Sequence, residues 1–227
     1  MPDRLRVLPA HEYRRERWRN GLGWTREIHR EFAPKAHRDD ACDPVPSDPA
    51  SAGDDWLWRL SIAEVERDAA FSAFPGIDRE LILLRGNGMR LRFDDGETVS
   101  LEPPHGRYRF SGERPLRGEP VDGATHDFNV MWRRDRIEAA VWHRPLVGSM
   151  VVFVEPGERW AIHALAGGAA ATDGERRCEI AAADTLLLAA NETRARFVLD
   201  GGGEALVIRL RTLNAPMSDV PAAGARE

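Results

Sequence analysis

The chain has 227 residues, of which 42% are hydrophobic and 30% are charged, so it carries enough apolar surface to offset the entropy of ordering a folded protein. A net charge of −5, with arginines scattered and not gathered into a basic face, argues against a nucleic-acid partner. No apolar run approaches the roughly 20 residues of a bilayer-spanning helix, and the N-terminus lacks the apolar stretch of a signal peptide. We therefore expect a cytoplasmic protein without a membrane partner.

Strand-like segments follow one another along most of the chain. They are short, they alternate or are rich in β-branched residues, and Gly, Pro, Asn or Asp bounds them. The alternation is cleanest at Met89-Arg90-Leu91-Arg92-Phe93, which predicts a half-buried strand. The predicted strands lie at 56–66, 80–86, 88–94, 97–103, 149–156, 184–190, 195–200 and 204–213.

The segments between these strands contain several predicted loops. Residues 33–55 are rich in Pro, Asp, Ala and Ser, which predicts a mobile surface insertion without chemistry, and 215–227 reads as a flexible tail. The Gly/Ala-rich stretch 165–177 is interpreted as a loop that ends in a hairpin turn, and the glycines at 201–203 are interpreted as a hairpin turn. Only 138–146 allows a short helix.

So many short strands at roughly 8–12-residue spacing predict an all-β sandwich or barrel. A strand, a Gly-rich turn and a further strand occur in both halves, which suggests two similar β units in tandem. We expect an N-terminal unit over 1–140 and a C-terminal unit over 141–214 that N-terminal strands complete. Exposed barrel edges would also allow two copies to pair as a homodimer.

The sequence offers little support for metal, cofactor or nucleophilic chemistry. None of the seven histidines forms an HxH pair or an HExxH helix face. His105 stands alone in EPPHGRYRF, Cys42 and Cys178 form no CxxC motif, and Ser61 lies in no GxSxG elbow. We therefore predict no metal site, no cofactor and no catalytic residue.

Polar residues share faces with one another on two predicted strands. In WRLSIAEV, Arg59 and Ser61 lie on one face, and in HDFNVMWRR so do Asp127, Asn129 and Arg133. Such a face is usually solvated, but inside a barrel it would suit a small ligand that carries carboxylate and amide groups.

Three blocks of the sequence resemble the HutD/Ves family of bacterial proteins. They are WRNGLGWTREI, WLWRLSIAEVERDAAFSAFPGIDRELILLRGNGMRL and VDGATHDFNVMWRRD, in order between residues 18 and 135, and beyond 140 the likeness is mainly architectural. Two features depart from the family pattern: Leu22-Gly23-Trp24 replaces a glycine run, and 33–55 is long. The resemblance implies a cupin-like fold of two fused barrel units (a bicupin) and an accessory or regulatory role in histidine utilisation.

The resemblance also suggests why Arg79 is of interest. Metal-binding cupins carry an HxH pair, a Glu and then a Gly at a strand turn; counting back from Gly86 places the Glu position at Arg79 and the second His position at Phe74 or Pro75. A guanidinium in place of a metal ligand would turn a cation site into an anion site. Alternatively, Arg79 pairs with Asp78, Glu80 or Asp127 and only holds a loop.

We therefore expect a metal-independent protein that binds a small carboxylate metabolite of the N-formylglutamate or urocanate type. Arg79, Arg59 and Arg26 are the candidates for the anion. The competing hypotheses are a cupin-type isomerase or hydrolase with His105 or Glu27 as general base, and a protein-interaction module without a small ligand. The full set of candidate ligand-binding residues is Asn20, Thr25, Arg26, Glu27, Arg59, Ser61, Phe74, Asp78, Arg79, Asp127, Asn129 and Arg133.

Overall fold

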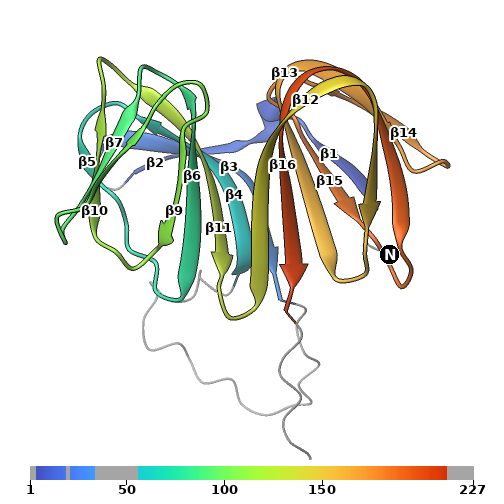
Figure 1. Cartoon of the computed structure of the whole chain (residues 1–227), viewed down its shortest axis with the longest axis horizontal. Helices are drawn as coiled ribbons and strands as arrows, with labels where there is room; N and C mark the ends of the chain where they lie inside the picture. The colour runs from blue at the N-terminus through green and yellow to red at the C-terminus, as the bar shows by residue number, and fades with distance from the viewer. Residues whose placement is uncertain (1–3, 19–20, 34–55, 214–227) are drawn as a thin grey trace, which may run out of the picture.

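The computed structural model describes residues 4–18, 21–33 and 56–213, and nearly all of its regular structure is antiparallel β-strand. Figure 1 shows the strands gathered in two lobes that lie side by side. The elements are β1 (Leu5–Leu8), the 3₁₀ turn η1 (Ala10–Glu12), β2 (Arg14–Arg17), β3 (Gly23–Phe32), β4 (Trp56–Val65), β5 (Ala69–Ala70), β6 (Ile77–Arg85), β7 (Met89–Phe93), β8 (Thr98–Leu101), β9 (Arg107–Ser111), β10 (Leu116–Pro120), β11 (Thr125–Arg133), β12 (Ile137–Val154), β13 (Glu158–Thr172), β14 (Arg177–Ala181), β15 (Thr185–Ala189) and β16 (Ala195–Thr212).

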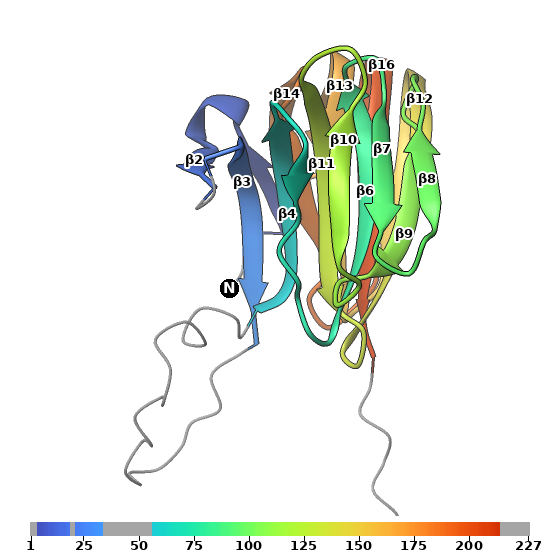
Figure 2. The same ribbon diagram turned by 90° about the vertical axis from the view of Figure 1, so that its left-hand side faces the viewer.

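The first lobe consists of two facing sheets. One has the strand order β2-β3-β4-β11-β6-β9 and the other the order β5-β10-β7-β8. Figure 2 turns this lobe toward the viewer and shows most of its strands roughly along one axis, with arrows that point both up and down. Between the sheets lies a core that includes Leu81, Leu83, Met89, Leu91 and Phe93, so the alternating strand at 89–93 is half buried as predicted.

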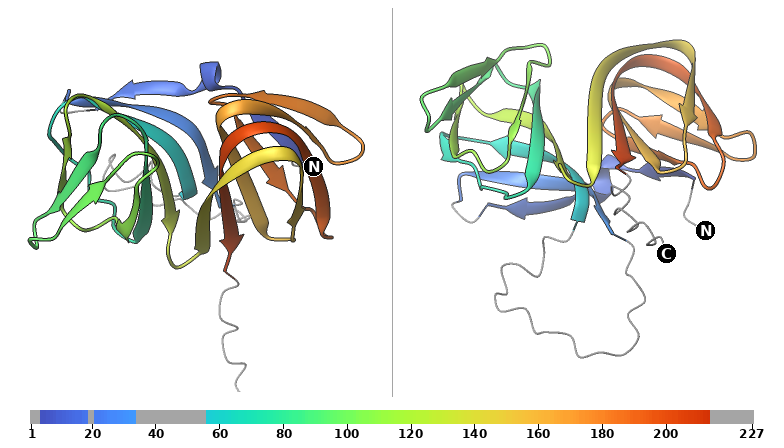
Figure 3. Two further views of the ribbon diagram at one scale, coloured as in Figure 1. Left: turned by 45° about the horizontal axis from the view of Figure 1, so that its top comes forward. Right: turned by 60° about the horizontal axis from the view of Figure 1, so that its bottom comes forward.

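The second lobe is formed by one curved sheet with the order β1-β15-β13-β16-β12, to which β14 is added along β13. The strand β1 comes from the start of the chain and pairs with β15, from Leu5 opposite Leu188 to Leu8 opposite Thr185. In Figure 3 the N-terminal segment passes along one side of both lobes. The division of the chain into two fused cupin units stays a prediction.

The sheet that contains β4, β11 and β6 is buried on both faces. Its inner face looks into the first lobe, and its outer face carries Leu60, Ile62, Phe128, Val130 and Trp132, which pack against residues of β12, β13 and β16. Because both faces are covered, the central strands are buried along almost their whole length, including polar positions on the inner face. This burial makes those polar positions informative about function.

Three local predictions are wrong. Residues 138–146 belong to β12, which pairs with β16 along its whole length, so no helix forms there. The glycines at 201–203 lie inside β16, and 165–172 lies in β13, where Gly167 is opposite Gly203. The hairpin turn predicted at the end of the 165–177 stretch does form, between β13 and β14. A Cβ atom at Gly203 would lie 1.9 Å from the carbonyl oxygen of Ala166, so these glycines permit a close approach of two strands, not a turn.

Among the described residues, no helix is long and apolar enough to cross a membrane. The 33–55 insertion, apart from Ala33, and the 215–227 tail lie outside the described residues, as do Asn20 and Cys42.

Candidate functional site

The inner face of the first lobe brings seven of the predicted ligand-binding residues onto one surface. Strand register places them in neighbouring cross-strand rows on β3, β4, β11 and β6. An eighth predicted residue, Arg133, lies on the same face at the end of β11, opposite Ile77. The seven residues are Thr25, Glu27, Arg59, Ser61, Arg79, Asp127 and Asn129.

One row carries three arginines. Arg30 is opposite Arg59, Arg59 is opposite Met131, and Met131 is opposite Arg79. The Glu27 carboxylate neutralises the first two in part, since its Oε2 accepts from Arg59 Nε at 2.8 Å and also from Arg30. Burial raises the pKa of Glu27, but these two arginines outweigh that effect and lower it overall, so Glu27 is ionised.

Arg79 differs from the other two because no carboxylate contacts it in the part of the chain that the structure describes. The residue is 4% exposed, and its guanidinium carbon lies 5.4, 5.6 and 5.3 Å from the ring centroids of Phe71, Phe74 and Phe110. Within the described ranges its polar contact is one hydrogen bond of 3.4 Å from Nη1 to the carbonyl oxygen of Ser72, and no described residue is a hydrogen-bond partner of the buried Nε. Burial, followed by the charge of Arg59, lowers the pKa of Arg79 to about 10.

Among the described residues Arg79 therefore forms no ion pair with Asp78, Glu80 or Asp127, which was the alternative in which Arg79 only holds a loop. Asp78 pairs with Arg109 and Arg134, and Glu80 pairs with Arg107. Asp127 accepts from Thr125 Oγ1 at 2.8 Å. Cation–π contacts with three rings stabilise the Arg79 guanidinium, but they do not neutralise its charge.

Asp127 and Asn129 each present a buried oxygen atom without a partner to the same face. Both Oδ1 atoms are shielded from solvent and receive no hydrogen bond from the described residues. Burial raises the pKa of Asp127 to about 7, and the hydrogen bond from Thr125 opposes this shift only in part. Unpartnered polar atoms are uncommon in protein interiors, and they often mark places where water or a ligand binds.

Two predicted residues lie away from this cluster. Arg26 lies on the opposite face of β3, where its Nε is 2.7 Å from Glu64 Oε1. Asp78 also lies on the opposite face, opposite Trp132. Asn20 is outside the described residues, while Phe74 borders Arg79 from the loop before β6.

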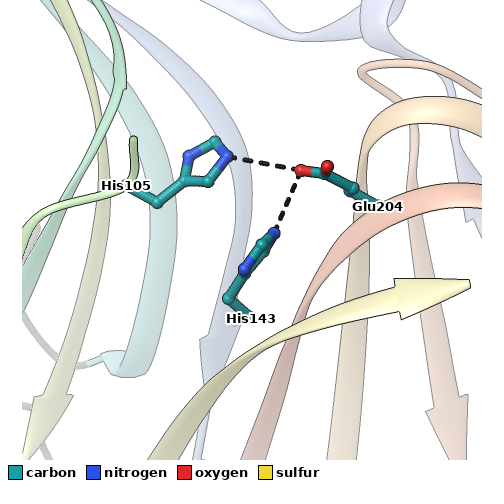
Figure 4. Close-up of side chains that lie close together, drawn as sticks. All are labelled: His105, His143 and Glu204. Carbon is teal, nitrogen blue, oxygen red and sulfur yellow. Dashed lines mark hydrogen bonds and ion pairs between the residues drawn. The ribbon is translucent and has the colours of Figure 1, made fainter. Parts of the chain in front are cut away.

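A second polar cluster lies where the two lobes meet, and sequence reasoning missed two of its three members. His105 precedes β9, His143 is on β12 and Glu204 is on β16 (Figure 4). His105 and His143 line a cavity of about 340 Å³, together with Pro104, Arg107, Trp142 and Arg144. No spacing motif connects the three residues, because they come together only through the pairing of distant strands.

A model of the HutD family matches residues 10–207. The chain belongs to the HutD family. It is 35% identical over 135 residues to an uncharacterised 21.2 kDa protein in the hutC 3' region of Pseudomonas putida, covering 60% of this chain and 62% of that one. It is also 38% identical over 125 residues to protein Ves of Cronobacter sakazakii, covering 55% and 58%. The alignments thus span about three fifths of these relatives.

Several solved structures share the fold over most of this chain. The conserved protein of unknown function PA5104 from Pseudomonas aeruginosa PAO1 is 28% identical with a TM-score of 0.73, over 93% of this chain and all of that one. HutD from Pseudomonas fluorescens SBW25 is 24% identical with a TM-score of 0.72, over 92% and 100%. Protein Ylba from Escherichia coli, of the DUF861 family, shares the fold at 9% identity with a TM-score of 0.64, over 94% and 93%. The fold of this HutD-family chain is cupin-like, as the sequence predicts.

Proposed function

We propose that this HutD-family protein binds a small carboxylate metabolite inside its first lobe and acts as an accessory or regulatory protein of histidine utilisation. The observation that carries the proposal is Arg79, a buried guanidinium without a carboxylate partner among the described residues. A buried charge is costly unless it is paired. A ligand carboxylate would supply the missing partner and would also reduce the repulsion between Arg79 and Arg59.

The neighbouring groups favour a ligand with an amide as well as a carboxylate. Asn129 lies on β11, one inner-face row away from the row that contains Arg79, and such rows are roughly 7 Å apart. Its Oδ1 accepts no hydrogen bond from the described residues. Asp127 follows in the next row with a second such oxygen. An N-acyl amino acid carries both a carboxylate for Arg79 and an N–H donor for these acceptors, and N-formylglutamate is a metabolite of this type.

The proposal is tested by thermal unfolding and calorimetric titration with formate, N-formylglutamate and urocanate. A ligand at a hundred times its dissociation constant should add about 2.7 kcal/mol to the free energy of unfolding. Arg79→Met should abolish this selective stabilisation, whereas Arg92→Met should retain it, because Arg92 is 57% exposed and pairs with Glu119 on the other sheet. Absence of stabilisation by all three compounds, or equal stabilisation of Arg79→Met, would contradict the proposal.

The role as a binding protein is distinguished from an enzymatic one by following the same compounds by NMR. We expect the signals of a bound compound to broaden or shift without conversion to a product. Continuous turnover that Glu27→Gln or His105→Ala abolishes would replace the proposal with a cupin-type enzyme.

A further inference from the structure

We propose that His105, His143 and Glu204 form a binding site for a divalent transition-metal ion of the zinc type between the two lobes. The candidate ligand atoms lie within 4.8 Å of one another. Figure 4 shows all three side chains converging on one point. This site is separate from the inner face of the first lobe, so the two proposals can fail independently.

The distances are close to those that a metal ion requires. His143 Nε2 is 3.1 Å from Glu204 Oε2, and His105 Nε2 is 3.6 Å from the same oxygen. Ligand atoms bound to one tetrahedral zinc ion at about 2.0–2.1 Å are separated by roughly 3.3 Å. If the three ligand atoms moved closer together by a fraction of this spacing, all three could therefore bind one zinc ion.

The hydrogen bonds of His105 support a cation at this position. Its Nδ1 lies 3.3 Å from the carbonyl oxygen of Leu83, which can only accept a hydrogen bond. That contact favours the tautomer with the proton on Nδ1, and so directs the lone pair of Nε2 toward the Glu204 carboxylate. A lone pair that faces an acceptor oxygen is repelled unless a second proton on the ring or a metal cation lies between them, and the imidazole and the carboxylate can bind either. A backbone carbonyl bound to the far nitrogen is also the usual support of a metal-binding histidine.

The ligands come from different parts of the fold, which gives the site a fixed frame. His143 and Glu204 lie on the paired strands β12 and β16, close to the register pair Pro145 and Glu204. His105, with a φ of 58°, lies in the loop between β8 and β9 of the first lobe. Bound metal would thus connect the first lobe to the long strands of the second.

The donor set indicates which ion fits. Two imidazole nitrogens and one carboxylate oxygen suit zinc, nickel or cobalt better than calcium or magnesium, which prefer oxygen ligands alone. His105 and His143 also line the cavity, together with Arg107 and Arg144. A water molecule or an anion would complete the coordination of the ion, and Arg144 provides a positive charge for an anion, whereas Arg107 is already paired with Glu80.

The test uses the full chain after removal of metal with a chelator, titrated with Zn²⁺ in a calorimeter and with Co²⁺ by visible absorption. We expect one ion per chain, a Co²⁺ spectrum typical of four-coordination, and a rise in Tm of about 5–10 °C at a hundredfold excess over Kd. His143→Ala and Glu204→Gln should each weaken Zn²⁺ binding at least tenfold. Their side chains are 42% and 48% exposed, so both variants should fold.

The matched control is His11→Ala, which removes a histidine that is 81% exposed on the surface and distant in the fold. It should bind Zn²⁺ like the wild type. A wild-type chain that binds no stoichiometric Zn²⁺, or Zn²⁺ binding that persists unchanged in His143→Ala, would overturn the proposal.

Discussion

The hydroxyl groups of Tyr13 and Thr185 lie 2.8 Å apart in the protein interior, although the two residues are 172 positions apart in sequence. Tyr13 Oη also donates to the carbonyl oxygen of Ala183 at 2.8 Å, and His163 Nδ1 lies 2.9 Å from Thr185 Oγ1. This hydrogen-bonded group fastens the segment between β1 and β2 to the edge of the second lobe. Burial raises the pKa of Tyr13 to about 12, so its hydroxyl keeps its proton at any physiological pH.

Tyr13→Phe should lower the free energy of unfolding by about 1–3 kcal/mol, because it leaves buried acceptors without their donor. Chemical denaturation measures this loss. Tyr108→Phe is the matched control: the Tyr108 hydroxyl bonds Glu97 in an exposed position, so its removal should change stability by at most about 0.5 kcal/mol. Equal losses in the two variants would show that the buried hydrogen bonds contribute nothing specific.

Asp127→Asn should change how stability depends on pH. The carboxyl has an ordinary pKa of 3.8 and a folded-state pKa of about 7. Its contribution is therefore full below pH 4 and is lost as the pH rises from about 4 to 7, because the unfolded chain ionises first. The asparagine variant lacks this loss, so its stability relative to the wild type should rise over that range by up to about 4 kcal/mol.

Denaturant unfolding from pH 4.5 to 8.5 measures the difference between the two proteins. The comparison of variants is needed because His163 acts in the opposite direction. Burial lowers the pKa of His163 from 6.5 to about 4, so its contribution is present above pH 6.5 and falls as the pH drops toward 4. A difference between wild type and Asp127→Asn that does not vary with pH would contradict the raised pKa.

The strand alternation predicted the inner face well, and the same rule explains where the prediction failed. Arg59 with Ser61, and Asp127 with Asn129, are two residues apart and share a face as expected. Thr25, Arg26 and Glu27 are consecutive, so the three could not all point into one lobe, and Arg26 points away. The His105–His143–Glu204 cluster could not be predicted, since it depends on strand pairing that only the folded chain reveals.

The glycine positions show a second limit of sequence reasoning. Gly-rich stretches in β-proteins usually mark turns, yet Gly203 and Gly167 face each other in the middle of long strands. The positions of glycine in the sequence do not distinguish a turn from a close contact between two strands. Only the register of β13 against β16 resolves this choice.

Arg79→Met should leave the ligand-free protein as stable as the wild type or more stable, by about 1–4 kcal/mol, because it removes a buried charge that lacks an opposite charge. The loss of cation–π contacts with three phenylalanines limits this gain. Arg59→Met should instead destabilise the protein, since Arg59 pairs with Glu27. Denaturant unfolding checks both, and a larger loss for Arg79→Met than for Arg59→Met would contradict this account.

Gly203→Ala should destabilise the protein by several kcal/mol or prevent its accumulation in soluble form. The residue has a φ of 127°, and the added methyl group would overlap the backbone of Ala166. Gly148→Ala is the control, since Gly148 has a φ of 72° but open space around its Cβ position. Its cost should stay near the roughly 1 kcal/mol of the backbone conformation alone, and thermal unfolding distinguishes the two.

The pairing of β1 with β15 has a consequence for how the protein is made. β1 leaves the ribosome well before its partner β15, because the strands from β2 to β14 lie between them in the sequence. The sheet of the second lobe therefore cannot close until β15 has been synthesised, and the pairing joins two segments that are separated by most of the described chain. Folding rates fall as such distant contacts become more important. The first lobe can form its central sheet earlier, because all strands of that sheet precede β12 in the chain. The edge strand β1 can pair only after β15 has been synthesised.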